Sequence, residues 1–137
     1  MKTKHCSLPT ALVIALMAIL ALPAIASTTG QPATPEQEIR YLLTTVGTSG
    51  CTFTRNGTQH SAEEAAAHLT MKYERAGSRI KTAESFIDRL ASESSWTGKP
   101  YLIQCGDATV PSRQWLTEQL QSYRAAGRTP VNLATTD

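Results

Sequence analysis

The apolar positions of this chain fall into four stretches with the spacing of helices that bury one face. In the first, apolar residues stand at i, i+3, i+4 and i+7 across residues 39–46. Thr34 and Gln37 form a T-x-x-Q capping box just before them, with Pro35 at the favoured first helical position. A second helix is predicted from residue 62 to about 75, beginning at the capping box Ser61 and Glu64. Two more are predicted at residues 83–91, after the cap Thr82, and at residues 113–126, after the cap Ser112.

Alternating polar and apolar residues predict a short strand over residues 51–55. Asn56-Gly57 follows, and this dipeptide suits a two-residue type I′ turn because both of its residues adopt positive φ. Residues 58–60 return as a second strand, and residues 101–105 have the composition of a third, whereas residues 106–110 are predicted to be a loop.

The element order predicts an α+β fold, in which about four helices pack on one face of a small three-stranded antiparallel sheet. The alternative is a mostly helical bundle in which the hairpin is only a flap.

The first 26 residues have the pattern of a secretory signal peptide. Lys2 and Lys4 give a basic start, residues 8–22 are almost entirely apolar, and residues 24–26 (A-I-A) form a small-residue cleavage site. The apolar run is shorter than the roughly 20 residues needed to cross a bilayer. We therefore expect cleavage after Ala26 and export to the periplasm, the alternative being an uncleaved anchor.

The rest of the chain is long enough for one domain. Residues 27–35 are small and polar and predict a flexible lead-in, residues 36–126 a single compact α+β domain, and residues 127–137 a loose C-terminal tail.

Charge argues against nucleic acid as a partner. The whole chain has 13 basic and 11 acidic residues, and loss of Lys2 and Lys4 would leave the two kinds balanced. No predicted element carries a basic stripe, which is the electrostatic footprint of nucleic-acid binding. After the signal peptide we also expect no stable membrane span.

Two cysteines, Cys51 and Cys105, remain after the predicted signal peptide, because Cys6 lies inside it. An even number in an exported protein is typical of a disulfide, and two cysteines allow one pairing. Such a bond would hold the first and third strands side by side and stabilise the domain by roughly 4 kcal/mol in the chain-entropy model. The alternative is a reactive or metal-binding pair, which lacks the usual C-x-x-C spacing.

Candidate chemistry gathers around two histidines. Glu64, His68 and Lys72 stand at i, i+4 and i+8 on one helix face, and His60 precedes the helix. Zinc accepts two imidazoles and a carboxylate, so His60, Glu64 and His68 form a candidate metal or acid–base cluster. The histidines are about two turns apart, roughly 12 Å of rise, and the alternative is that they are structural or partly exposed.

A second candidate site is the hydroxyl-rich stretch of residues 92–101. Ser92, Ser94 or Ser95, with His60 or His68 and an acid such as Asp107, would supply the residue types of a serine hydrolase. Neither a G-x-S-x-G elbow nor an S-x-x-K motif surrounds these serines, and such a loop more often satisfies the carbonyls at the end of a helix.

The same stretch also has residues typical of recognition. Trp96 and Tyr101, with Arg55 and Arg113, are of the types that anchor binding surfaces. If the hairpin tip and this stretch lie close together, they form one face for a peptide, glycan or protein. The alternative for Trp96 is a place in the core.

Three stretches together resemble a known family. They are C-T-F-T-R-N-G-x-x-H-x-x-x-E-A-A-x-H-L-x-x-K at residues 51–72, A-E-x-F-I-x-x-L-A-S-x-S-S-x-x-G-x-P-Y-x-I at 83–103, and S-x-x-W-L at 112–116. This combination resembles the YfeK-like family of small exported bacterial proteins, a domain of unknown function. The resemblance implies a periplasmic protein of Gram-negative bacteria and carries over no catalytic residue.

We therefore predict a non-enzymatic binding domain of the cell envelope, without a cofactor or metal, whose partner is an envelope protein, a peptide or a glycan. The residues expected to bind are Arg55, His60, His68, Lys72, Ser94, Ser95, Trp96 and Tyr101. The alternative is a small hydrolase or metal-dependent enzyme that uses His60, Glu64 and His68 with Ser94 or Ser95.

Overall fold

The helices of the computed structural model, which describes residues 31–128, begin at the predicted capping residues. Thr34 caps α1 (Pro35–Thr48), and Ser61 caps α2 (Ala62–Ala76). In both, the cap side chain accepts from the backbone three residues on, and the side chain of that third residue accepts from the cap backbone. The two predicted capping boxes are therefore confirmed.

The third predicted helix changes its geometry halfway. The short α3 (Ala83–Phe86) begins after Thr82 as expected and continues into a π-helical turn, η2 (Ile87–Ala91). Two backbone carbonyls of this turn accept hydrogen bonds from side chains. Ser92 Oγ donates to the Ile87 carbonyl oxygen at 2.6 Å, and Lys72 Nζ donates to the Leu90 carbonyl oxygen at 2.5 Å. The widened turn is thus tied to α2 through Lys72.

Two further helical elements complete the part of the chain that the structure describes. A single 3₁₀ turn, η1 (Gly77–Arg79), links α2 to α3. The last helix, α4 (Ser112–Arg128), includes Ser112 rather than starting after it, and it runs through Gly127. Residues 127 and 128, which the sequence assigned to the tail, are therefore helical.

The sheet has four strands, one more than predicted, in the antiparallel order β2-β1-β3-β4. β1 (Thr52–Arg55) and β2 (Thr58–His60) form the predicted hairpin, and β3 (Leu102–Cys105) pairs with the other side of β1. Asn56 and Gly57 have φ angles of 53° and 85°, as a type I′ turn requires.

The additional strand is β4 (Ala108–Pro111), so the prediction of a loop at residues 106–110 is wrong. Gly106, with a φ of 63°, lets the chain reverse at once, and Val110 then pairs with Ile103. β4 is an edge strand with one half-buried residue, which is why its sequence carries little periodicity and why it tolerates Pro111.

The predicted disulfide between Cys51 and Cys105 is confirmed. Their Cα atoms are 4.7 Å apart, at the end of the sheet where β1 begins and β3 ends. The bond therefore joins neighbouring strands, as expected for an α+β domain.

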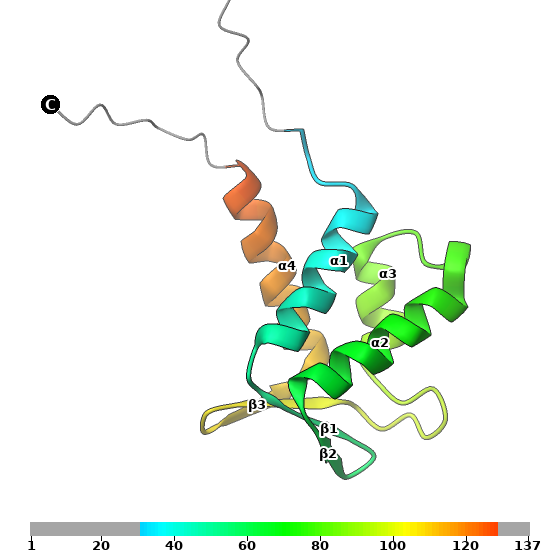
Figure 1. Cartoon of the computed structure of the whole chain (residues 1–137), viewed down its shortest axis with the longest axis vertical. Helices are drawn as coiled ribbons and strands as arrows, with labels where there is room; N and C mark the ends of the chain where they lie inside the picture. The colour runs from blue at the N-terminus through cyan, green and yellow to red at the C-terminus, as the bar shows by residue number, and fades with distance from the viewer. Residues whose placement is uncertain (1–30, 129–137) are drawn as a thin grey trace, which may run out of the picture.

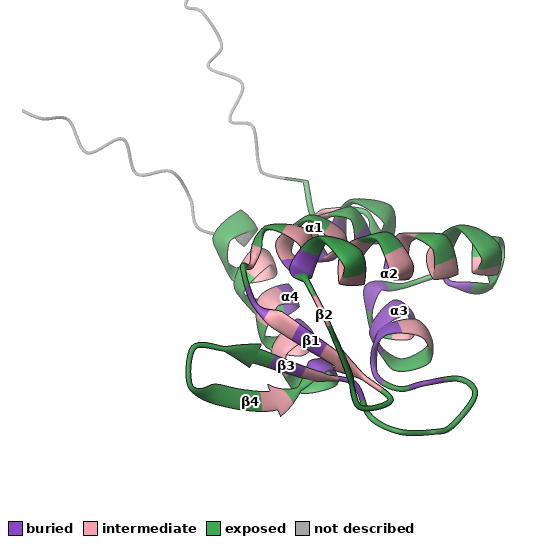
Figure 2. Cartoon of the chain, turned by 60° about the horizontal axis from the view of Figure 1, so that its bottom comes forward, coloured by how far each residue is buried: buried purple, intermediate pink, exposed green. Residues whose placement is uncertain are grey.

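The hydrophobic core lies between the sheet and the helices, which gather on one side of it (Figure 1, Figure 2). The α1 stripe predicted from the sequence is largely buried, and the sheet contributes Phe53 and Ile103 to the same core. The largest fully buried side chains include Phe86, Ile39, Leu42, Ile103, Leu116 and Val46.

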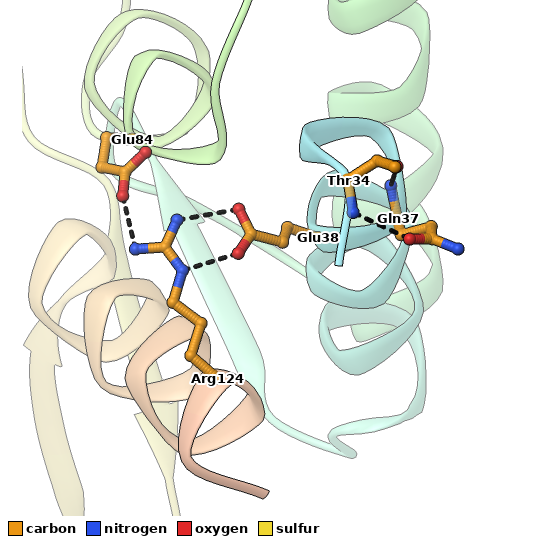
Figure 3. Close-up of polar contacts among 5 residues, drawn as sticks. All are labelled: Thr34, Gln37, Glu38, Glu84 and Arg124. Atoms are coloured by element: carbon orange, nitrogen blue, oxygen red, sulfur yellow. Dashed lines mark hydrogen bonds and ion pairs between the residues drawn. The ribbon is translucent and has the colours of Figure 1, made fainter. Parts of the chain in front are cut away.

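One ion-pair network ties three helices together (Figure 3). Arg124 on α4 donates through Nε and Nη2 to both carboxylate oxygens of Glu38 on α1, at 2.6 and 2.8 Å. Its Nη1 donates to Glu84 on α3 at 2.6 Å. Glu38 is buried, so this fork satisfies a carboxylate that has left water.

Several sequence predictions fall outside the described residues. These are the signal peptide at residues 1–26, most of the lead-in at 27–35, and the tail from residue 129. Within residues 31–128, the helices are too short or too polar to cross a membrane.

Candidate functional site

A cavity of about 360 Å³ opens between the β1–β2 hairpin and the first half of α2. Most of its wall is apolar, and the residues of this kind are Phe53, Ala65, Ala67, Leu69 and Ala91. The alanines of α2 leave space where larger side chains would close it, and the π-helical turn brings Ala91 to the wall. The volume is at the small end of the range for ligand-binding pockets.

Arg55 and His68 both line this cavity and are in direct contact with each other. Arg55 projects from the end of β1, and its Nη1 lies 2.7 Å from Nε2 and 3.1 Å from Nδ1 of the His68 ring. A guanidinium only donates, so the imidazole accepts and is neutral. Burial, and then the charge of Arg55, lower the pKa of His68 below its usual value of 6.5.

His60 lies at the end of β2, beside the start of α2. Its Nδ1 is 3.7 Å from Oε2 of Glu64, whose carboxylate already accepts from the Ser61 amide at 3.0 Å. Its Nε2 is buried and has no hydrogen-bond partner among residues 31–128. The ring therefore offers one unpaired polar atom beside an apolar cavity.

Lys72 lies behind the cavity wall and contacts Tyr101. Its Nζ donates to the Leu90 carbonyl, lies 3.5 Å from the Tyr101 hydroxyl, and is 5.3 Å from the centre of the Tyr101 ring. Burial, and then Arg55, lower the pKa of Lys72, while burial raises the pKa of Tyr101. Lys72 thus adds positive potential to a site that Arg55 already makes positive.

Both backbone polar groups of Tyr101 are hydrogen-bonded. Its amide donates to the Ser92 carbonyl at 2.9 Å, and its carbonyl accepts from the Ser112 amide at 2.8 Å. The aromatic ring is consequently held in the wall by the end of η2 and the start of α4.

The other three predicted binding residues lie on the loop before Tyr101, outside the cavity. Ser94 is buried, and its Oγ accepts from Asn56 Nδ2 and from the Thr97 amide, each at 3.3 Å. Thr97 Oγ1 donates to Asn56 Oδ1 at 2.6 Å. The loop and the hairpin tip are therefore in contact, as the recognition hypothesis requires.

Ser95 and Trp96, on the same loop, are open to solvent. Ser95 is exposed, and Trp96 is 95% exposed. The alternative that Trp96 belongs to the core is therefore wrong.

The geometry gives the enzyme alternative no support. Among residues 31–128, histidine, cysteine and acidic side chains form no group of three able to hold a metal ion. His60 and His68 have separate neighbours, Glu64 and Arg55 respectively. Ser94 is bonded to Asn56 rather than to a histidine.

Four of the eight predicted binding residues, Arg55, His60, His68 and Tyr101, line the same cavity. The sequence missed other members of the wall. The sequence predicts Ser112 only as a helix cap, and it gives Phe53 in its strand and Ala91 in its helix no part in a site. The feature that could have indicated Ala91 as a cavity residue is its small size at a buried position, because a leucine there would fill the space.

Comparisons with known proteins agree with the resemblance to YfeK-like proteins. A family model described as a family of unknown function (DUF5329) matches residues 33–124. The uncharacterized protein YfeK of Salmonella typhimurium is 58% identical over 50 residues, which are 36% of this chain and 42% of that protein. The matched part thus spans less than half the length of that relative. No solved structure matches the chain.

Proposed function

Since this chain belongs to the family of unknown function DUF5329, we propose its function from the geometry of its cavity: it is a non-enzymatic binding domain of the cell envelope. The cavity between the β1–β2 hairpin and α2 is the binding site. The hairpin tip and the Trp96 loop form the adjoining surface, which a larger partner would also touch.

The observation that carries this proposal is the convergence of Arg55, His60, His68 and Tyr101 on one cavity. These residues come from three separate segments of the chain, and they surround apolar walls. A concave, mainly apolar site with a few convergent polar groups is the usual form of a small-ligand site.

Location in the periplasm is part of the same proposal. The basic start, apolar run and A-I-A site of residues 1–26 support export, and the disulfide fits an oxidising compartment. Export predicts that protein recovered from the periplasm of expressing cells begins at Ser27. Recovery only from the cytoplasm, with residue 1 intact, would contradict it.

Binding is tested by screening a library of small fragments against isotope-labelled protein by NMR. We expect some fragments to shift the amide signals of β1, β2 and the first half of α2 together, in a saturable manner. Ala65→Leu fills the cavity and should abolish these shifts, whereas Ala126→Leu, on the exposed surface of α4, should not. Fragments that bind equally to both variants, or that never shift the cavity signals, would refute the proposed site.

A further inference from the structure

The cavity has a charge pattern that narrows its ligand. From this pattern we infer that it binds an apolar molecule ending in a carboxylate, with the carboxylate at Arg55 and the apolar part between Phe53 and Leu69. This inference rests on the proposed function and specifies its ligand class.

Among residues 31–128, no acidic side chain forms an ion pair with the guanidinium of Arg55. Only its Nη1 contacts a neighbouring side chain, the ring of His68, and just one nitrogen of that neutral ring can accept a hydrogen bond. Within residues 31–128 its Nη2 and Nε have no hydrogen-bond acceptor, and no carboxylate lies within 4.0 Å of it. These two unused donors lie side by side, in the fork that binds a carboxylate through two parallel hydrogen bonds.

The one acidic residue in the wall does not supply that carboxylate. Glu64 is engaged with the Ser61 amide, as the second half of the capping box of α2, and it lies beside His60. Behind the wall, Lys72 adds a second positive charge, and it lowers the pKa of His68 as Arg55 does. The potential at the arginine side of the cavity is therefore positive.

The rest of the wall sets the apolar requirement. Phe53, Leu69 and Ala91 are buried, and they surround the space with carbon. A strongly hydrated anion such as phosphate would gain nothing from these surfaces and would lose water on entering. A carboxylate on a short hydrocarbon satisfies both halves of the site, and the size of the cavity limits that hydrocarbon to a small group.

This chemistry has two sources. One is a free short-chain carboxylic acid, and the other is the C-terminal residue of a peptide that ends in a leucine-like side chain. A free acid fits wholly inside the cavity, whereas a peptide would continue outward over the hairpin.

Paired ligands that differ only in charge test the inference. Hexanoate and hexanamide have the same shape, as do an N-acetylated dipeptide ending in leucine and its C-terminal amide. Titrations followed by NMR should show each carboxylate binding at least about tenfold more tightly than its amide, since a hydrogen bond to a charged group accounts for that factor or more. Tighter binding by hexanoate than by the dipeptide would identify a free acid as the ligand, and the reverse order a peptide terminus.

Substitutions then test the role of each charge. Arg55→Gln should remove the preference for carboxylate over amide, and Arg40→Gln, an exposed residue paired with Glu36, should leave it unchanged. Glu64→Gln keeps the capping box, because glutamine also accepts from the cap amide, and should tighten carboxylate binding by roughly twofold. Thermal melting of each variant verifies that it is folded.

Two results would overturn the inference. Equal binding of hexanoate and hexanamide in the cavity would refute the carboxylate and leave the proposed binding function standing. No binding by any of the four ligands, in a protein whose cavity does take up neutral fragments, would do the same. If the cavity takes up no fragment at all, the proposed function fails with it.

Discussion

Arg124 and Arg55 both place a guanidinium against the body of the protein, but they meet opposite surroundings. Arg124 is clasped by Glu38 and Glu84, so that three of its nitrogens donate to carboxylates (Figure 3). Arg55 meets His68, with Lys72 behind the cavity wall and no acid within ion-pair distance among residues 31–128.

This difference in neighbours indicates that Arg124 stabilises the fold, whereas Arg55 is available to bind a ligand. The hydrogen bonds to Glu38 and Glu84 raise the pKa of Arg124, and the hydrogen bond from Arg124 lowers the pKa of Glu84, which are the directions expected of a closed ion pair. Near Arg55 the shifts run the other way, because burial first, and then the charge of Arg55, lower the pKa values of His68 and Lys72. The part of these shifts that comes from the positive charges of Arg55 and Lys72 marks a place where a ligand carboxylate would be stabilised.

The largest expected effect concerns the disulfide, which stabilises the fold that holds both arginines in place. The double variant Cys51→Ala, Cys105→Ala should lower the free energy of unfolding by about 4 kcal/mol, because the disulfide closes a loop with a sequence separation of 54. Urea unfolding measures this loss, and reduced wild-type protein should unfold at the same urea concentration as the double variant. Equal stability of oxidised and reduced protein would contradict this role for the bond.

The second effect tests the structural role of Arg124. Arg124→Gln leaves the Glu38 side chain, which is only 9% exposed, without its charge partner and should cost roughly 2–3 kcal/mol. The loss is expected below the usual range for a buried pair because Arg124 itself is 36% exposed. Arg40→Gln, which breaks an exposed pair with Glu36, should change stability by less than about 0.5 kcal/mol. Equal losses in the two variants would contradict a structural role for Arg124.

The third effect tests whether Arg55 contributes to the stability of the fold. Arg55→Gln should change the free energy of unfolding by less than about 1 kcal/mol, since the lost contact to His68 is offset by relief of charge repulsion around Lys72. The same urea experiment measures it. A loss as large as that of Arg124→Gln would assign Arg55 to the fold and weaken its role in binding.

The smallest effect is a pH dependence of stability. Because the pKa of His68 is lowered in the folded protein, the unfolded chain takes up the proton first as the pH falls below 6.5. The contribution of His68 to stability is thus complete above that pH and is lost as the pH falls through the folded pKa. The charged groups that affect His68 are Arg55, Lys72, His60 and Arg75.

This dependence is isolated by comparing wild type with His68→Gln. Urea unfolding of both at about pH 7.5 and about pH 5 should show a larger drop for wild type. Equal drops would mean that groups other than His68 account for the whole acid effect.

Elements whose signals lie within a few residues were predictable from the sequence. The capping boxes at Thr34 and Ser61 are local hydrogen-bond patterns, and Asn56-Gly57 is a local backbone preference. The disulfide was also predictable, because two cysteines leave one pairing.

Features that depend on contacts across the chain were not predictable. β4 exists because β3 offers it a partner, and its own residues carry one half-buried position. The π-helical turn depends on side chains that bond its carbonyls, among them Lys72 from another helix.

The site divides in the same way. Arg55, His60 and His68 were singled out by residue type, and Tyr101 by its place beside a loop. That they line one cavity follows from the pairing of β1 with β2 and the packing of α2 against the sheet. Ser94 holds the hairpin tip through Asn56, which is likewise a contact between residues far apart in the chain. The sequence therefore could not distinguish this structural role from that of a catalytic serine.

The comparison of the two arginines is tested most directly by following their side-chain Nε–H signals by NMR while hexanoate is added. We predict that the Arg55 signal shifts saturably and that of Arg124 stays in place, because Glu38 already occupies its donors. Hexanamide should move neither signal to the same extent. An Arg55 signal that ignores hexanoate, or that responds equally to the amide, would contradict the assignment of Arg55 to carboxylate binding.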